Sequence, residues 1–298
     1  MSTAPAPGTA EWASLVTASK VAAILGVSPW DSPRSIWHKM RGDIPNSPGN
    51  NATRRGNYLE AGVLAWWSDQ HPDNHYDIRE QYYAVRDDLP WAAATLDALA
   101  VHTDGTCDVV EVKTAARPDE WGTPGTDEIP THYLAQVQWQ LAMVPDAHRA
   151  YVAVLFGPGL EFAEYVVERD DATTDALIRI CHTFYASLTD DECPPHLDDT
   201  VATYDTLRRL NPDINPGGTT ELTEDVAREY VDALAAEKAA TARARLAKST
   251  VLDLMGTDRV AVFDGTTVAR RQNGRGDAIS LYQVAKTLPT ITDKEAAA

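Results

Sequence analysis

Hydrophobic residues recur with the period of an α-helix in several parts of the chain. Within residues 57–70, for example, Leu59, Val63, Trp66 and Trp67 fall on roughly one side of a helix. Glycine, proline and small polar residues separate these stretches, as they do at helix ends. The pattern predicts helices over residues 17–26, 33–40, 57–70, 133–143, 175–188 and 222–256.

Between the predicted helices, short runs rich in β-branched and aromatic residues predict strands. A turn sequence, Thr103-Asp104-Gly105, separates two of them. The predicted strands cover residues 81–86, 93–101, 108–114, 150–156 and 162–167. An order of helices, three strands, a helix, two strands and a helix predicts an α/β core, in which a mixed central sheet is flanked by helices.

Segments rich in proline and glycine divide the chain into predicted domains. A shorter segment of this kind, residues 44–52, is expected to be a loop within the core. In the C-terminal part a long helix precedes a hairpin, residues 260–263 and 267–271, which turns at Asp264-Gly265. The expected organisation is a disordered tail (1–10), a main domain (11–196), a proline-rich linker (197–220) and a C-terminal helix-and-hairpin appendage (221–298).

The formal net charge of −18 argues against a protein that grips DNA mainly by neutralising phosphates. Charge is unevenly spread, however, because residues 237–275 hold eight basic and four acidic residues, a local excess of +4. This segment either stabilises the fold or forms a basic arm that contacts DNA or an annealing protein. Trp30 and the pair Trp66-Trp67 could stack on nucleobases, but packing in the core is the favoured interpretation.

The three cysteines, Cys107, Cys181 and Cys193, form no CxxC pair. Reduced thiols are therefore expected rather than a zinc ribbon or a disulfide framework. No apolar run approaches the roughly 18 residues of a membrane helix. The sequence contains no P-loop, so ATP-driven translocation within this chain is not expected. These features favour a cytoplasmic protein.

Glu111 and Lys113 lie two residues apart in a predicted strand, so both side chains are expected on one face, with Val112 opposite. Asp97 lies fourteen residues before Glu111, in a predicted strand that could pair with this one as a hairpin. Carboxylates packed side by side repel each other unless a cation lies between them. Since hard oxygen ligands suit Mg²⁺ or Mn²⁺, the sequence predicts a divalent-metal site here.

Composition alone does not certify this site. With 44 acidic residues and seven lysines among 298 residues, about one acid-x-Lys triplet is expected by chance. Taken alone, Glu111 and Lys113 are more typical of an exposed strand face. The interpretation therefore depends on the surrounding motifs.

Further short motifs accompany the pair in a fixed order along the chain. They are Thr17-Ala18-Ser19 at the start of the first helix, Arg55-Gly56-Asn57-Tyr58-Leu59-Glu60, Thr95-Leu96-Asp97-Ala98-Leu99, Glu111-Val112-Lys113 and Tyr133-Leu134-Ala135-Gln136-Val137-Gln138. In this order they resemble the lambda-exonuclease/YqaJ family of phage recombination nucleases, over about residues 17–171. The resemblance implies a restriction-endonuclease-like core, so that residues 11–196 would be a PD-(D/E)xK nuclease domain.

The resemblance also implies the ligands of a metal site. Asp97 and Glu111 would bind one or two Mg²⁺ ions, for which Mn²⁺ could substitute, and the Val112 carbonyl would be a further oxygen ligand. Glu60 would reach toward a metal from its helix, often through water. The chain departs from the family at Leu96 and Ala98, where Pro and Gly are usual, which affects the local turn but not the ligand.

Two further catalytic residues follow from the same resemblance. Lys113 would position or deprotonate the attacking water and offset charge on the scissile phosphate, and Gln136 would orient the water or a phosphate oxygen. The family's arginine upstream of the first helix has no equivalent here, because Glu11-Trp12-Ala13-Ser14 stands in its place. The residues that could bind the DNA end instead are Ser19, Lys20, Arg54 and Arg55.

The expected function is Mg²⁺-dependent exonucleolysis of linear double-stranded DNA in a bacterial host cell. The resemblance, not the residue chemistry, implies 5′ to 3′ polarity, a 3′ single-stranded product, and partners that include double-stranded DNA ends and a single-strand annealing protein. It also implies a homo-oligomer, a trimer or tetramer. The alternatives are a RecB/Cas4-like nuclease or an endonuclease on the same core, or a catalytically silent partner-binding protein.

Overall fold

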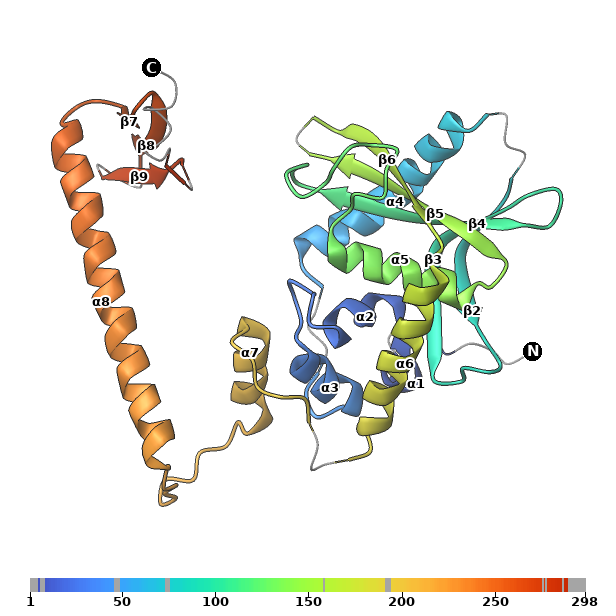
Figure 1. The fold of residues 1–298 in the computed structure, drawn as a ribbon, viewed down its shortest axis with the longest axis horizontal. Coiled ribbons are helices and arrows are strands. Elements are labelled where there is room, and N and C mark those ends of the chain that lie inside the picture. The colour runs from blue at the N-terminus through green and yellow to red at the C-terminus, as the bar shows by residue number, and fades with distance from the viewer. Residues whose placement is uncertain are drawn as a thin grey trace. The chain divides into compact units, whose positions relative to one another are not determined.

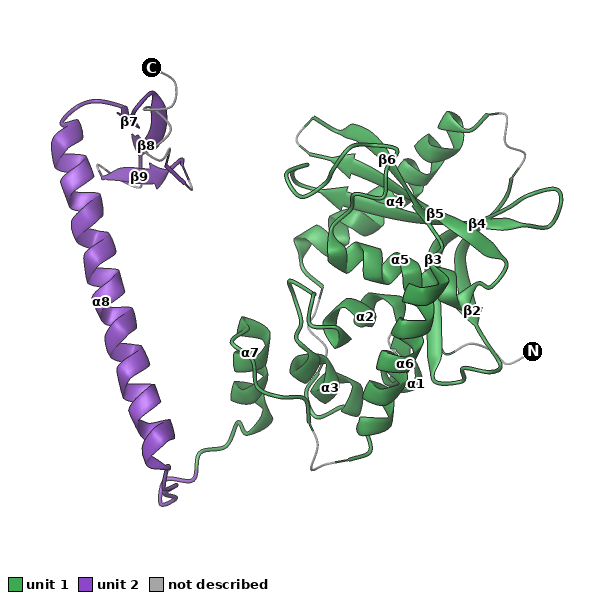
Figure 2. Ribbon diagram, in the orientation of Figure 1, with its two compact units in different colours: residues 1–214 green, residues 215–298 purple. Residues whose placement is uncertain are grey.

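The computed structural model describes residues 5, 9–45, 49–72, 76–157, 159–190, 194–274, 276, 278–285 and 287–288. Most of the predicted N-terminal tail lies outside these residues. The chain divides into two compact units, residues 1–214 and 215–298 (Figure 2).

A six-stranded mixed sheet forms the centre of the first unit (Figure 1). Its strands lie in the order β1-β3-β4-β5-β6, and β2 pairs with β3 as well. The pairs β1–β3 and β4–β5 are parallel, and the other pairs are antiparallel. The strands are β1 (Val16–Thr17), β2 (Asp77–Val85), β3 (Ala92–Val101), β4 (Cys107–Ala115), β5 (Ala147–Phe156) and β6 (Glu161–Glu168).

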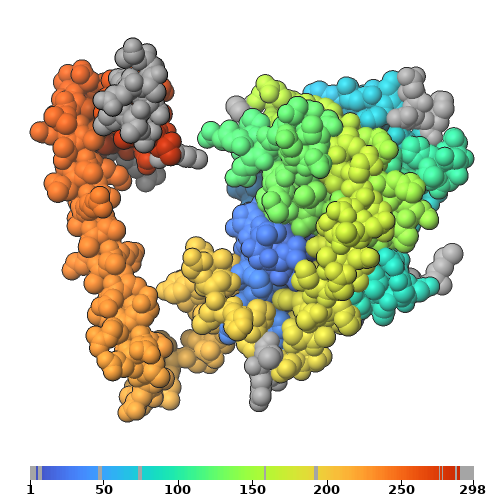
Figure 3. All heavy atoms as spheres, viewed as in Figure 1, coloured from blue at the N-terminus to red at the C-terminus, as the bar shows by residue number. Residues whose placement is uncertain are grey.

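Helices cover both faces of this sheet. On one face, α2, α3, α5 and α6 supply side chains to the larger hydrophobic cluster, and α2, α5 and α6 contact one another. In the space-filling view, the blue N-terminal segments lie against the yellow-green segment that includes α6 (Figure 3). On the other face, α4 packs through Val63, Leu64 and Trp67. This arrangement confirms the predicted fold class. The helices are α1 (Ala10–Ser14), α2 (Ala18–Ile24), α3 (Pro33–Arg41), α4 (Asn51–Gln70), α5 (Thr131–Met143), α6 (Asp171–Ser187) and α7 (Val201–Leu210).

Helix α4 begins six residues earlier than the hydrophobic pattern predicts. The side chain of Asn50 accepts hydrogen bonds from the backbone N–H groups of Ala52 and Thr53, at 2.8 and 3.0 Å. This cap satisfies two of the amides that a helix start leaves unpaired. The additional turn is polar, so it lacks the apolar period on which the prediction relied. The end of the predicted loop, residues 51–52, is therefore helical.

Part of the predicted linker belongs to the first unit. Residues 201–210 form α7, which contacts α3. The contact includes a hydrogen bond of 2.6 Å between the hydroxyl groups of Ser32 and Thr203, both of which are buried. Since polar rather than apolar side chains make this contact, the sequence of α7 carries little hydrophobic signal.

The second unit consists of α8 (Glu224–Met255) and an antiparallel sheet in the order β7-β8-β9. Strands β7 (Val260–Phe263) and β8 (Thr266–Asn273) form the predicted hairpin, and Asp264 and Gly265 turn it with φ angles of +49° and +75°. A third strand, β9 (Ile279–Gln283), was not predicted. Among the described helices of both units, none is long and apolar enough to cross a membrane.

Candidate active site

The candidate site lies where strands β3 and β4 separate. These strands share only four residue pairs, the last of them Ala98 with Val110, whereas β4 continues beside β5 as far as Ala115. Beyond this point the backbone N–H of Val112 donates to Oδ2 of Asp97, at 2.7 Å. A carboxylate thus takes the place that a strand carbonyl would have in a continuous ladder.

The alternation of side chains along β3 reverses at the same point. Leu96 belongs to the hydrophobic cluster under α2 and α5, whereas Ala98 belongs to the cluster under α4. In a regular strand, residues two apart share a face. The β2–β3 ladder is interrupted between the pairs Glu80–Ala98 and Tyr82–Leu96, so that Gln81 and Asp97 lie at the gap, and Gln81 has a φ of +51°. The reversal brings Asp97 onto the face of the sheet that Glu111 occupies, as a bulge does when it re-aims a side chain.

Glu111 is the centre of a buried hydrogen-bond network. Its side chain is 3% exposed and forms an ion pair with Lys113. The amide groups of Gln136 and Gln140, one turn apart on α5, donate to its two carboxylate oxygens, each at 2.5 Å. The sequence analysis identified Gln136 but missed Gln140. Their spacing of four residues places both on one helix face, which is the signal that could have revealed Gln140.

The electrostatics of the site depend on burial and on the close packing of its charges. Burial and the neighbouring Glu111 carboxylate raise the pKa of Asp97 to about 8. Burial lowers the pKa of the Lys113 ammonium, but the carboxylates of Glu111 and Asp97 outweigh this effect and raise it above its ordinary value. Lys113 is therefore an ammonium at neutral pH, and its charge does not fully compensate the two carboxylates.

We expect metal-free protein to lose stability as pH rises toward 8. The ordinary pKa of an aspartate is 3.8, so between pH 3.8 and about 8 folded Asp97 keeps a proton that the unfolded chain has released. The free energy of unfolding then falls by up to about 1.4 kcal/mol for each pH unit in this window. The Asp97→Asn variant has no ionisable group at position 97. Its melting temperature is therefore expected to exceed that of the wild type by a growing margin as pH increases.

Thermal melts from pH 5 to pH 8.5, in the presence of a chelator, measure this effect. Added Mg²⁺ should reverse the order, because it can stabilise only the protein that carries both carboxylates. If the melting temperatures of the two proteins change with pH in the same way, the pKa of Asp97 is not raised.

A cleft of about 520 Å³ opens over this site. Four of the five residues predicted to be catalytic line it, namely Glu60, Asp97, Lys113 and Gln136, together with Val112. Glu111 lies beneath them. The side-chain amide of Gln81 donates to Oε1 of Glu60, at 2.5 Å. The other residues that line the cleft are Ser19, Trp30, Asn50, Ala52, Thr53, Gly56, Asn57, Thr114 and Tyr133.

The predicted DNA-binding residues have different surroundings. Ser19 lines the cleft, and Arg55 lines a neighbouring hollow of about 330 Å³ that shares Thr114 with the cleft. Arg54 is exposed and lines neither of the two. Ser19 and Arg55 therefore line hollows at the candidate site, whereas Arg54 does not line either of them.

The prediction of Lys20 as a DNA contact is wrong. Lys20 is only 8% exposed. Its ammonium donates to the backbone carbonyls of Trp12, Ala13 and Leu15, at 3.3, 2.7 and 2.6 Å. These carbonyls lie at the C-terminal end of α1, where a positive charge is favourable. Burial lowers the pKa of Lys20 to about 8. Lys20 thus fastens α1 to α2.

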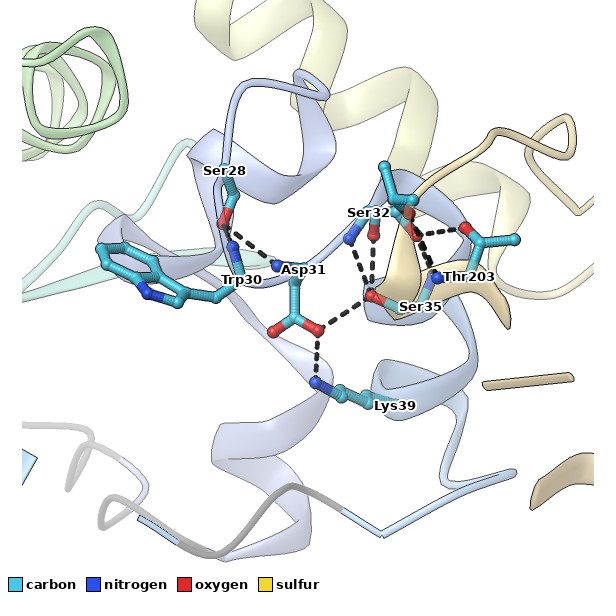
Figure 4. A network of polar contacts seen from close by, with 8 residues as sticks. Ser28, Trp30, Asp31, Ser32, Ser35, Lys39 and Thr203 are labelled. Atoms are coloured by element: carbon cyan, nitrogen blue, oxygen red, sulfur yellow. Dashed lines mark hydrogen bonds and ion pairs between the residues drawn. The ribbon is translucent and has the colours of Figure 1, made fainter. Parts of the chain in front are cut away.

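Trp30 is the exposed aromatic residue at the rim of the cleft. It lies between α2 and α3, is 65% exposed, and contacts the ring of His132, with centroids 5.0 Å apart. Figure 4 shows its side chain pointing away from a polar network that holds this loop. Within the network, Ser28 Oγ accepts hydrogen bonds from the backbone N–H groups of Trp30 and Asp31, both at 3.2 Å.

The same network connects the loop to two helices (Figure 4). Asp31 accepts a hydrogen bond of 2.8 Å from Ser35 and forms an ion pair with Lys39, both on α3. Ser32 contacts Thr203 of α7. The backbone that carries Trp30 is therefore fixed although its ring is exposed. The interpretation of Trp30 as a core residue is wrong, whereas Trp67 is fully buried.

The donor set of the site fits a hard divalent cation. No group of three or more His, Cys, Asp or Glu side chains converges anywhere in the described part of the chain in a way that could hold a metal. Magnesium, however, commonly binds through one or two carboxylates and completes its shell with water and substrate phosphate. Asp97 and Glu111 would supply such a pair, and burial together with the neighbouring Glu111 carboxylate raises the pKa of Asp97.

The fold and the site define a mixed α/β domain with two carboxylates and a lysine at an opening of its central sheet. Residues 12–147 match the model of the YqaJ-like viral recombinase domain. The match confirms the resemblance found in the sequence. Its limits include α2 to α5 and the last residues of α1, but neither α6 nor α7.

The individual proteins that resemble this chain share 28% of its sequence or less. The uncharacterized protein YqaJ of Bacillus subtilis (strain 168) is 28% identical over 196 residues, which are 64% of this chain and 58% of that protein. An alkaline exonuclease from Laribacter hongkongensis has 20% identity and a TM-score of 0.47, over 59% of this chain and 88% of that one. A phage-related exonuclease from Haemophilus somnus 129PT has 12% identity and a TM-score of 0.42, over 60% and 96%.

Proposed function

We propose that this protein is a Mg²⁺-dependent deoxyribonuclease that digests linear double-stranded DNA from its ends. The single observation that supports this most strongly is the convergence of Asp97, Glu111 and Lys113 at one opening of the sheet, under a cleft. Polarity from 5′ to 3′, a 3′ single-stranded product, and a trimeric or tetrameric assembly that meets an annealing protein are parts of the proposal that derive from the family resemblance.

Asp97, Glu111 and the Val112 carbonyl would hold the cation, with Glu60 reaching it through water. Bound there, Mg²⁺ would stabilise negative charge on the attacking and leaving oxygens of a phosphodiester displacement. Glu111 cannot rotate freely, because Lys113, Gln136 and Gln140 all donate to it. Such preorganisation lowers the cost of binding a cation and its water shell.

Lys113 contributes a positive charge rather than a base. Because its pKa is raised, it keeps its proton at neutral pH and can donate a hydrogen bond to the attacking water or to a phosphate oxygen. Its ammonium also lies 5.2 Å from the centre of the Tyr133 ring, which limits where it can move. Gln136 lines the cleft and can orient the same water through its amide.

Linear duplexes labelled at the 5′ or at the 3′ end, with a covalently closed circle as control, test the proposal. In Mg²⁺ we expect loss of label from the linear substrates, an intact circle, and no reaction in a chelator. Cleavage of the circle would favour the endonuclease alternative. A protein that leaves every substrate intact would be a catalytically silent binding protein, and the proposal would be wrong.

We expect Trp30→Ala to weaken binding of DNA ends by about 5- to 150-fold, the range that corresponds to one lost base–aromatic stack. The exposed ring at the rim of the cleft can contact a base adjacent to the scissile phosphate. Trp30→Phe should retain most of the affinity. Fluorescence anisotropy with a labelled duplex, in an Asp97→Asn background that prevents digestion, measures the effect.

Trp66→Ala is the matched control for this experiment. Trp66 is 41% exposed and stacks on Phe162 at 5.2 Å, but it does not line the cleft. Equal affinity of the Trp30→Ala and Trp66→Ala proteins would show that Trp30 has no role in binding.

A further inference from the structure

Gln81 of β2 joins two elements that the candidate site needs. Its side-chain amide donates to Oε1 of Glu60 on α4, at 2.5 Å, across 21 residues of sequence. Glu60 lines the cleft with Asp97. A carboxylate on a partly exposed helix face samples several rotamers, and a hydrogen bond to one of its oxygens selects among them. Gln81 thus orients the Glu60 carboxylate without touching the cleft itself.

The backbone of Gln81 is strained. Its φ of +51° lies in the left-handed region, where a side chain is unfavourable and glycine or asparagine is usual. The residue does not belong to a turn, because β2 pairs with β3 on both sides of it, at Glu80 with Ala98 and at Tyr82 with Leu96. Strain of this kind persists where the surroundings determine the conformation, and it is frequent at functional sites.

Both features lie beside the same catalytic residues. Gln81 and Asp97 lie at the gap in the β2–β3 ladder, where the alternation of β3 reverses, and the side chain of Gln81 reaches Glu60. We infer that Gln81 is a positioning residue for the proposed metal site, and that it fixes the Glu60 carboxylate at the wall of the cleft. The inference rests on the proposed function, since it concerns the binding of Mg²⁺.

A purely structural role makes a different prediction. If Gln81 only allows the strands to change faces, glycine should serve better, because it adopts a positive φ without strain. If the amide positions Glu60, glycine should stabilise the fold and still weaken the site. The Gln81→Gly variant therefore separates the two roles, since stability and metal affinity move in opposite directions.

We expect Gln81→Gly to raise the melting temperature of metal-free protein by about 2–4 °C. Its dissociation constant for Mg²⁺, from titration calorimetry, should increase by about 10- to 100-fold, the usual effect of removing a hydrogen bond to a metal ligand. In cleavage assays the Mg²⁺ concentration needed for half-maximal rate should increase by the same factor, whereas the rate at saturating Mg²⁺ should largely recover. Gln81→Asn, which tolerates a positive φ and keeps an amide, should lie between the two.

Leu160→Gly is the control for the strain. Leu160 is exposed and has a φ of +56°, but it does not line the cleft that Glu60 lines. This variant should gain the same melting temperature and keep the wild-type affinity for Mg²⁺. Equal affinity in wild type and Gln81→Gly would overturn this inference alone. A wild type that binds no Mg²⁺ at millimolar concentration would overturn the proposed function, and the inference with it.

Discussion

Changing Asp97 to alanine is expected to reduce the rate of DNA cleavage by at least about 1,000-fold. The variant would lose one of the two carboxylates that converge at the opening between β3 and β4, and with it most of the affinity for the cation. The effect should appear in single-turnover rates on a linear duplex at saturating Mg²⁺. Binding of the DNA itself should change little, since the proposed contacts of Ser19, Trp30 and Arg55 are unaltered.

A folded variant is necessary for this test to be informative. At pH 8.5, where Asp97 is largely ionised without metal, Asp97→Ala removes a repulsive charge from beside Glu111, so its melting temperature there should equal or exceed that of the wild type. Asp87→Ala, in the exposed connection between β2 and β3, is a matched control that should retain full activity. Wild-type cleavage by Asp97→Ala would exclude the proposed mechanism.

Changing Lys113 to methionine is expected to reduce the cleavage rate by about 100- to 1,000-fold while Mg²⁺ still binds. Methionine keeps most of the aliphatic length but has no charge and no donor. Removal of the competing ammonium should even increase the affinity of Glu111 for Mg²⁺, because the ammonium donates to a carboxylate oxygen that could otherwise bind the cation. Single-turnover rates and titration calorimetry on the same protein separate catalysis from metal binding.

The assays on Lys113→Met require Mg²⁺ throughout purification. Without the ammonium, the buried Glu111 carboxylate has no opposite charge beside it, and the metal-free variant should be less stable. Lys113→Arg should recover part of the rate, because it restores the charge in a bulkier form. If Lys113→Met loses Mg²⁺ binding together with activity, Lys113 acts in assembling the site rather than in catalysis.

Much of the fold was predictable from the sequence, because the helices and strands of the core have the hydrophobic periods of their classes. The residues of the site were predictable for another reason. Asp97, Glu111 and Lys113 stand within short motifs whose order resembles a known family, and the matched segment, residues 12–147, includes all of them. The chemistry of the residues alone would not have distinguished this Glu-x-Lys step from one that arises by chance.

The geometry that unites these residues was not predictable. Strand β3 has the sequence AAATLDALAV, in which small apolar residues occupy both faces, so no contrast between alternating positions marks the reversal at Asp97. Gln81 adopts a conformation that its residue type disfavours, and only the surrounding sheet specifies it. The burial of Lys20 was not predictable either, since the sequence cannot show that a lysine packs against the end of a short helix.

The opening between β3 and β4 also separates the β2–β3 part of the sheet from the β4–β5 part. Asp97 lies on β3, which pairs with β2, whereas Glu111 and Lys113 lie on β4, which pairs with β5, and four residue pairs join β3 to β4. A cation held by the carboxylates of Asp97 and Glu111 would therefore link the β2–β3 part of the sheet to the β4–β5 part. Occupancy of this cation site would limit how far the two parts of the sheet can separate. Amide hydrogen exchange at the opening between β3 and β4 would therefore slow as the cation binds.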